Sequence, residues 1–398
     1  MTPTRRLFDE NSHLFDFSAT VLSEEPTHIP GVLHVVLDAT AFFPEGGGQS
    51  PDTGVLGGCP VMDVQEKDGV IYHSVKADAP FPAVGETVEG HLDREIRLRK
   101  MQNHSGEHII SGIVHRLYGY TNVGFHLGNG DVTLDFDGVL TREQLNAIED
   151  EANRIVAACL PVKAYYPTPE VLATLTYRAK LDLTENVRMV EIGQGDGMMD
   201  RCACCAPHVD NTGEIGLIKL LDFIHYKGGV RIHMLCGLDA LEDYRRRYTD
   251  VALLASRLSV KQNDLVAGFD RLTAEIEEKK QVIFDLRQTI LTMTLAALPE
   301  TDGSLCLFEE TGDANAMRRL LNEAVKKCKK LCGVFCGDDE NGYRYVIGRG
   351  DASLDLKQYN REISAALNAK GGGSSEMLQG RASATKEQIE AFFENFSG

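Results

Sequence analysis

The sequence predicts an α+β protein built from four parts. Short alternating strands with hairpin turns fill the first ninety residues, strand and helix patterns alternate afterwards, and a seven-residue apolar repeat separates two such regions. We expect a β-barrel with a glycine-rich motif over 1–92, an α/β core over 93–245, a helical arm over 246–298 and a small α/β domain over 299–398. A chain of 398 residues is long enough for two or three hydrophobic cores.

The first two parts carry clear local signals. Strand patterns such as GVLHVVLDATAFF precede a hairpin turn at Asp68-Gly69. From 93 to 118 the apolar spacing becomes helical, and Gly119 suits the end of that helix. A hairpin follows at 124–138. Thr141 and Gln144 then form a capping box for a helix that ends near 158.

The third part is marked by two rows of apolar residues, each with a period of seven. This is the a/d pattern of a coiled coil, interrupted at Gln262 and Lys279. We expect one long helical arm, paired with a second chain or folded back on a neighbour. The rows are Val251, Leu258, Leu265, Leu272, Leu286 and Met293, and Phe269, Ile276, Ile283 and Ile290.

The composition indicates a cytoplasmic protein. No apolar run has the length of a signal peptide or of a membrane span. Ten cysteines in a chain of this kind point to a reducing compartment, where clustered Cys and His suggest metal binding rather than disulfides.

The net charge of −18 disfavours extended contact with nucleic acid, because phosphate binding needs basic groups. Local basic patches remain candidates, although solvated faces are their ordinary interpretation. The patches are Arg94, Arg97, Arg99 and Lys100, then Arg245–Arg247, then Lys326, Lys327, Lys329 and Lys330.

Two pairs of potential metal ligands stand out. His104 and His108 are four residues apart on a predicted helix and therefore share a face. Cys204 and His208 repeat this spacing in a cysteine-rich loop. Three nitrogens and one sulfur form a set that zinc prefers. Cys202 or Cys205 could replace Cys204, and spacing does not decide between these thiols.

The stretch HSGEH at 104–108 also matches the H-x-x-E-H pattern of inverted zinc proteases, in which the glutamate activates water. Glu107 would take that role. Such a protease would draw its third ligand from a distant carboxylate and would not need a Cys-x₃-His loop.

The two ligand pairs and the following VDNTGEIG resemble the editing domain of alanyl-tRNA synthetases and their free-standing relatives, the AlaX-type alanyl-tRNA editing proteins. Three other segments agree with this resemblance. AFFPEGGGQSPDTG at 41–54 is similar to the family's glycine-rich motif, VGFHLG at 123–128 to its pocket-lining hairpin, and KGGGSSEMLQG at 370–380 to the C-terminal glycine-rich domain called DHHA1. The resemblance covers nearly the whole chain and is nearest to the long form.

The resemblance implies a hydrolase that removes serine or glycine from mischarged tRNA(Ala), with zinc held by His104, His108, Cys204 and His208. In this reaction Glu107 is a candidate general base and His126 a candidate polar contact to the substrate. The resemblance also implies contacts to tRNA and a possible homodimer through the C-terminal half. The implied tRNA contacts are Gly46, Gly47, Gly48 and Gln49 near the acceptor end, and Lys370, Gly371, Gly372 and Gly373, with Arg381 nearby, along the backbone.

The chain departs from the synthetase pattern in two places. Cys205-Ala206-Pro207 replaces Gly-Gly-Thr, and Glu107 replaces a small neutral residue. The chain also begins only about forty residues before its glycine motif, so we expect no aminoacylation domain. A zinc peptidase and a non-enzymatic RNA-binding module with a structural zinc are the alternative functions.

Overall fold

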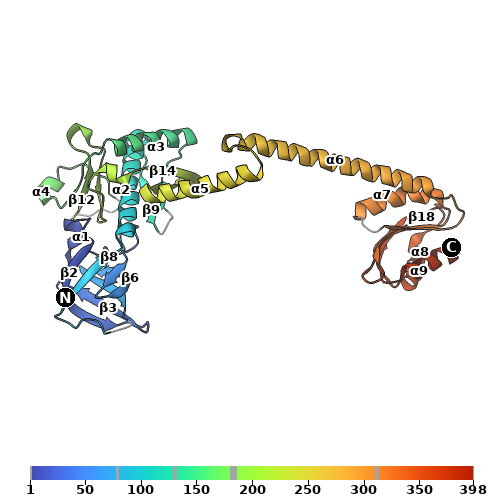
Figure 1. Cartoon of the computed structure of the whole chain (residues 1–398), viewed down its shortest axis with the longest axis horizontal. Helices are drawn as coiled ribbons and strands as arrows, with labels where there is room; N and C mark the ends of the chain where they lie inside the picture. Colours follow the sequence, from blue (N-terminus) through green and yellow to red (C-terminus); the bar gives the residue numbers. More distant parts are fainter. Residues whose placement is uncertain (1, 78–79, 129–131, 180–185, 310–312, 398) are drawn as a thin grey trace. The chain divides into compact units, whose positions relative to one another are not determined.

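The computed structural model describes residues 2–77, 80–128, 132–179, 186–309 and 313–397. Its contacts divide the chain into two units, Met1–Leu253 and Leu254–Gly398. Both units combine helices with sheets (Figure 1), which confirms the predicted mixed class. The finer division into four parts remains a prediction.

Six strands near the N-terminus form a closed hydrogen-bonded ring in the order β2-β3-β7-β6-β5-β8. Apolar side chains such as Val21, Val35 and Val64 fill its interior and are fully buried. The turn between β6 and β7 uses Asp68 and Gly69, both with positive φ, as the sequence predicts. The strands are β2 Asp16–Pro26, β3 Val32–Leu37, β5 Gly54–Leu56, β6 Cys59–Lys67, β7 Val70–Lys76 and β8 Thr87–Leu92.

Three short elements accompany the ring. Strands β1 (Arg5–Arg6) and β4 (Ala39–Thr40) pair in parallel, and helix α1 spans Leu7–Glu10.

The ring leads directly into helix α2 (Arg94–Tyr118), which is buried along most of its length. The Asp93 side chain accepts a hydrogen bond from the Ile96 N–H at its start, and Gly119 ends it with φ of 71°. Both ends agree with the prediction, because a capping carboxylate and a left-handed glycine are strong local signals.

A four-stranded sheet packs against α2 and α3 in the order β14-β15-β10-β9. Its strands are β9 Asn122–Leu127, β10 Val132–Phe136, β14 Ile218–Tyr226 and β15 Gly229–Cys236. Helix α3 (Arg142–Ala157) begins with the predicted capping box of Thr141 and Gln144. Fully buried Leu134, Ile148 and Ile232 belong to the core between these layers.

A second, three-stranded sheet has the order β11-β12-β13. Its strands are β11 Val162–Tyr165, β12 Met189–Ile192 and β13 Asp200–Ala203, and the short helix α4 covers Pro169–Leu172. Strand β13 ends immediately before Cys204, so this sheet positions the cysteine-rich loop.

The predicted single arm is wrong in its continuity, because α5 spans Gly237–Arg257 and α6 spans Leu265–Ala297. Between them Ser259 adopts φ of 54°. Its N–H bonds the Ser256 carbonyl at 3.1 Å, and the Val260 N–H bonds the Ala255 carbonyl at 3.0 Å. These bonds form the Schellman type of helix end, which usually contains glycine.

The second unit contains a five-stranded sheet in the order β16-β17-β18-β20-β19. Helix α7 (Ala314–Ala324) packs on one face, and helices α8 (Leu356–Ala366) and α9 (Lys386–Asn395) pack on the other (Figure 1). The segment KGGGSSEMLQG forms the β19–β20 hairpin rather than a flexible linker. The strands are β16 Leu305–Glu309, β17 Leu331–Asp338, β18 Gly342–Arg349, β19 Ala369–Gly373 and β20 Met377–Ala382.

Within the described ranges, no helix is both long and apolar enough to cross a membrane. The ten cysteines, all of which lie in those ranges, form no disulfide.

Candidate metal centre

The four predicted metal ligands come together in the first unit. Helix α2 supplies His104 and His108, and the loop after β13 supplies Cys204 and His208. One ligand atom from each residue lies within 4.8 Å of the others. The Cys204 Sγ is 3.4 Å from Nε2 of both His104 and His208. The two pairs predicted from the sequence therefore form one cluster of four side chains in the structure.

Each histidine has its other ring nitrogen next to an oxygen. Nδ1 of His104 lies 2.8 Å from Gln49 Oε1, and Nδ1 of His108 lies 3.2 Å from Asp200 Oδ2. Nδ1 of His208 lies 3.0 Å from Ser105 Oγ. The amide oxygen of Gln49 and the carboxylate of Asp200 can only accept, and the Ser105 hydroxyl is able to accept as well. With Nδ1–H donated to these oxygens, each Nε2 has a lone pair for a metal ion.

The glycine-rich motif carries one of these oxygens. Gly46 and Gln49 exchange backbone hydrogen bonds of 3.1 and 3.0 Å across a tight turn, in which Gly47 and Gly48 have φ of 61° and 85°. The Gly48 carbonyl accepts a 2.7 Å bond from the Leu127 N–H of β9. This docking buries Gln49 beside His104, so the ring contributes directly to the metal centre.

The neighbouring thiols are not part of the convergent set. Cys202 is buried in β13, and Cys205 is exposed with its sulfur near Gly46 and Gly47. Arg188 holds the loop by donating to the carbonyl oxygens of Cys204 at 3.2 Å and Ala206 at 2.8 Å. The structure thus favours Cys204 among the three candidate thiols.

Burial shifts the pKa of two of the four residues. It raises the pKa of the Cys204 thiol and is the main reason that the pKa of His208 lies well below its usual value. Neighbouring His108 and His104 lower the pKa of His208 further. A buried Cys204 thiol and a buried His208 imidazole would both be stabilised by a cation, which would also convert the thiol to a thiolate.

Glu107 lies beside the cluster and is 2% exposed. Its Oε1 accepts hydrogen bonds from Ser111 Oγ at 2.8 Å and from Asn122 Nδ2 at 2.6 Å. Its Oε2 lies 3.7 Å from the metal-directed Nε2 of His108. The carboxylate is therefore fixed at the edge of the ligand set rather than in solvent.

The structure does not bring His126 to the cluster. The Phe125 ring packs 4.8 Å from the ring of His104, measured between centroids. Successive residues of a strand point to opposite faces, so the exposed His126 on β9 points away from the ligands. The hairpin named by the resemblance does contact the cluster, but the residue that does so is Phe125 rather than His126.

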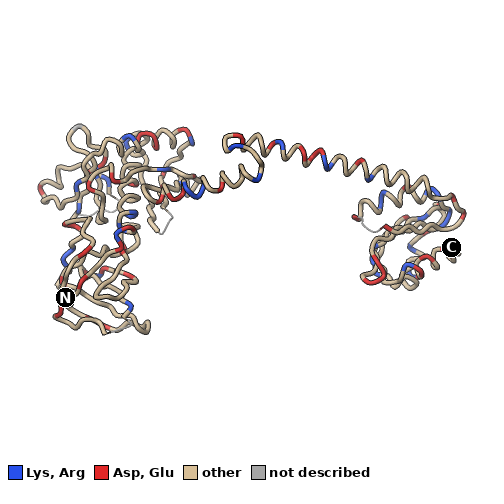
Figure 2. The backbone as a smooth tube through the Cα atoms, viewed as in Figure 1, with Lys and Arg blue, Asp and Glu red and all other residues tan. Residues whose placement is uncertain are grey.

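Several basic residues proposed for phosphate contact serve internal roles instead. Arg97 is buried and donates from Nε to Asp52 at 2.9 Å, and Lys100 donates to the Ser50 carbonyl at 3.2 Å. Lys327 and Lys330 donate to backbone carbonyls. The others are exposed or bonded to acidic neighbours, and Figure 2 shows both charge signs interspersed along the chain. Acid-bonded residues include Arg99, Arg246, Arg247, Lys326 and Lys329.

The glycine run of the second unit lies in an edge strand. Lys370 is paired with Arg381, which is paired in turn with Arg344 across β18, β20 and β19. All three are exposed. A Cβ at Gly371 would overlap the Gln379 carbonyl oxygen, so this glycine is needed for close approach to the neighbouring strand.

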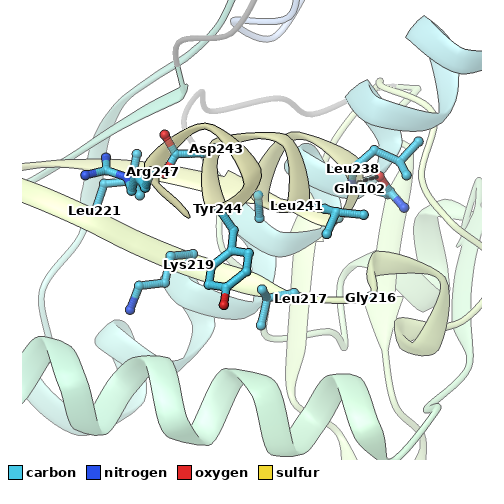
Figure 3. A pocket seen from close by; sticks show the side chains of 12 residues that line it. Gln102, Gly216, Leu217, Lys219, Leu221, Leu238, Leu241, Asp243, Tyr244 and Arg247 are labelled. Atoms are coloured by element: carbon cyan, nitrogen blue, oxygen red, sulfur yellow. Dashed lines mark hydrogen bonds and ion pairs between the residues drawn. The ribbon is translucent and has the colours of Figure 1, made fainter. Parts of the chain in front are cut away.

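The first unit also contains a cavity of about 630 Å³ between β14 and α5 (Figure 3). Leu217, Leu241 and Tyr244 give it a mainly apolar lining, and Asp243 at its edge is bonded to Arg247. None of the four metal ligands lines this cavity.

Two family models match parts of the chain. The second additional domain of threonyl and alanyl tRNA synthetases matches residues 187–233, and the class II (A) tRNA synthetases match residues 17–96. The alanyl-tRNA editing protein AlaX-L of Pyrococcus horikoshii is 28% identical over 374 residues, which cover 90% of each protein. The chain is therefore similar in sequence to an alanyl-tRNA editing protein over nearly its whole length.

Alanine–tRNA ligases show the same relationship over a part of their length. The ligase of Thermofilum pendens is 31% identical over 402 residues, and that of Caldivirga maquilingensis is 35% identical over 396 residues. Each alignment covers 96% of this chain but only 43% and 42% of the ligase, respectively. The chain therefore spans less than half of these ligases.

Sequence reasoning selected the four residues that converge in the structure but missed the polar residues beside them. Ser105 and Asp200 are separated from their histidine partners by 103 and 92 residues, respectively. No local pattern marks such pairs. The sequence offers one weak signal for these partners: each lies within a few residues of a predicted ligand, Ser105 next to His104 and Asp200 four residues before Cys204.

Proposed function

We propose that the chain is a zinc-dependent hydrolase of the cytoplasm that cleaves the ester between serine or glycine and tRNA(Ala). The observation that carries this proposal is the convergence of His104, His108, Cys204 and His208 in a chain similar in sequence to an alanyl-tRNA editing protein.

The donor set fits zinc. Three imidazole nitrogens and one sulfur within 4.8 Å of one another suit tetrahedral coordination. Bound there, zinc would supply Lewis-acid chemistry that polarises a carbonyl or lowers the pKa of water.

Glu107 is the proposed general base. Ser111 and Asn122 fix its Oε1, which leaves Oε2 directed toward the ligand set. Oε2 takes a proton from water as the water oxygen attacks the ester carbonyl. The bond from the carbonyl carbon to the tRNA 3′ oxygen then breaks, and the Glu107 proton passes to that oxygen. The products are the free amino acid and uncharged tRNA.

Such a hydrolase is needed because an alanine pocket rejects similar amino acids poorly. One methylene or one added hydroxyl changes discrimination by only about ten- to two hundred-fold. A second site that forms a hydrogen bond with the serine hydroxyl is a stronger filter, since alanine lacks that group.

The second unit is proposed to bind tRNA and to dimerise. Lys370, Arg381 and the edge strand at Gly371–Gly373 offer cations and exposed backbone to RNA phosphates. On α6, exposed Ile276, Ile283 and Ile290 occupy one heptad position, and Leu272 and Leu286 occupy another. Isoleucine at a with leucine at d favours a parallel two-stranded coiled coil with a second copy.

The decisive experiment compares deacylation of Ser-tRNA(Ala), Gly-tRNA(Ala) and Ala-tRNA(Ala) by the purified zinc-loaded chain. We expect at least one mischarged substrate to be hydrolysed much faster than Ala-tRNA(Ala). Equal rates for all three, or cleavage of peptides with intact seryl- and glycyl-tRNA, would overturn the proposal and favour the peptidase. Zinc binding without any hydrolysis would instead favour a structural site in an RNA-binding module.

Glu107→Gln tests the base within this mechanism. The amide keeps the shape and the Oε1 contacts but cannot take the proton. We expect the rate to fall roughly 100-fold or more with zinc content unchanged. An unchanged rate would assign water activation to another group.

A further inference from the structure

The three histidines of the metal centre have chemically different partners. Gln49 and Ser105, which contact His104 and His208, are neutral. The partner of His108 is a buried carboxylate, Asp200. The centre is thus asymmetric around its ligands.

Asp200 is held by a second charged residue. Arg178 donates from Nε to Asp200 Oδ1 at 2.8 Å and from Nη2 to Oδ2 at 2.7 Å. The same Oδ2 faces Nδ1 of His108. This bidentate arrangement fixes the carboxylate plane and therefore the direction from which His108 is contacted.

The backbone of Arg178 is also fixed. Its N–H donates to the Arg201 carbonyl at 2.9 Å, and its own carbonyl accepts from the Ala203 N–H at 2.9 Å. Arg178 therefore extends the β11-β12-β13 sheet beside the strand that carries Asp200. The strand, the carboxylate and the guanidinium form one rigid support that ends at Cys204.

We propose that Asp200 and Arg178 are positioning residues that orient the His108 ring and strengthen it as a zinc ligand. This inference rests on the zinc site of the proposed function. An anion that accepts the Nδ1–H raises the electron density at Nε2 and removes rotational freedom of the ring. Arg178 balances the buried charge of Asp200, which would otherwise be costly to desolvate.

The test is zinc affinity, measured by competition with a chelator of known affinity and with Zn²⁺ as the only added metal. We expect Asp200→Asn to weaken zinc binding by about 10- to 100-fold, the usual cost of removing such a partner. Asp243→Asn is the matched control. Asp243 is a similarly buried carboxylate bonded to Arg246 and Arg247, but it lies outside the metal centre. We expect its variant to retain wild-type zinc affinity.

A double-mutant cycle with His108→Ala separates positioning from general destabilisation. If Asp200 acts through His108, Asp200→Asn adds no further loss of zinc affinity in the His108→Ala background. An equal loss in both backgrounds, or wild-type affinity in the single variant, would overturn the inference. Asp200→Asn combined with Arg178→Gln removes both charges of this ion pair and provides the same test if the single variant does not fold.

Failure of the inference is distinguishable from failure of the proposed function. A wild-type chain that binds no zinc would refute both. Tight zinc binding that Asp200→Asn does not alter would refute only the role of Asp200 and leave the hydrolase proposal in place.

Discussion

Replacing Gly48 by alanine should disrupt the metal centre, although Gly48 is not one of the four candidate ligands. Gly48 has φ of 85°, which costs an L-residue about 1–2 kcal/mol. A Cβ at this position would also overlap the backbone carbonyl oxygen of Phe125. The clash is between two backbone segments that are hydrogen-bonded to each other, so a side-chain movement does not relieve it. We therefore expect the glycine-rich loop to separate from β9.

The size of the effect follows from the two backbone hydrogen bonds that hold the loop on β9. Undocking breaks the Leu127 N–H bond to the Gly48 carbonyl and the Ser50 N–H bond to the Leu127 carbonyl. Each contributes about 1 kcal/mol, so the free energy of unfolding should fall by about 3–4 kcal/mol in total. Gln49 would also leave His104, which should weaken zinc binding by about 10- to 100-fold.

Gly47→Ala is the matched control. Gly47 also has positive φ, but a Cβ there meets only the Cys205 sulfur at 3.6 Å. For Gly47→Ala the free energy of unfolding should fall by only about 1–2 kcal/mol, and the zinc affinity should not change. Urea unfolding and chelator competition measure the two effects. Equal stability and equal zinc affinity for the two variants would refute the docking argument.

Three other predictions use separate measurements. Cys204→Ala should lose zinc and Cys205→Ala should retain it, as elemental analysis would report; the reverse result would exchange their roles. Burial lowers the pKa of His73 from 6.5 to about 4. As pH falls through this range, the unfolded chain binds a proton at His73 before the folded chain does, so the free energy of unfolding is highest above pH 6.5 and decreases until about pH 4. Wild-type stability should therefore fall by about 3 kcal/mol more than that of His73→Gln across this range, and parallel unfolding curves would contradict this. Lys370→Gln with Arg381→Gln should weaken tRNA binding and reduce the slope of log affinity against log salt by about 1–2, whereas an unchanged slope would exclude these phosphate contacts.

Local signals account for what the sequence predicted well. The bounds of α2 follow from Asp93 and Gly119, because capping residues act within one helical turn. The convergence of His104 and His108 was predictable because a spacing of four on a helix fixes a shared face. Cys204 and His208 lie in a loop, so their spacing alone did not fix their geometry. The end of α5 was not predictable, because Ser259 takes a conformation that glycine normally signals. Asp200 could not be assigned to His108, because their contact depends on the packing of β13 against α2.

The hydrogen bond between Gln49 and His104 has a consequence for protein engineering. The chain between the ring and α2 offers an attractive place to join domains from different homologues at 92/93. A chimera joined there would receive His104 from one parent and Gln49 from the other. Its activity would depend on whether the glycine turn of the other parent binds β9 in the same position and places Gln49 beside His104. The boundary between the ring and α2 therefore divides residues of one metal centre, so the ring and α2 have to be exchanged together.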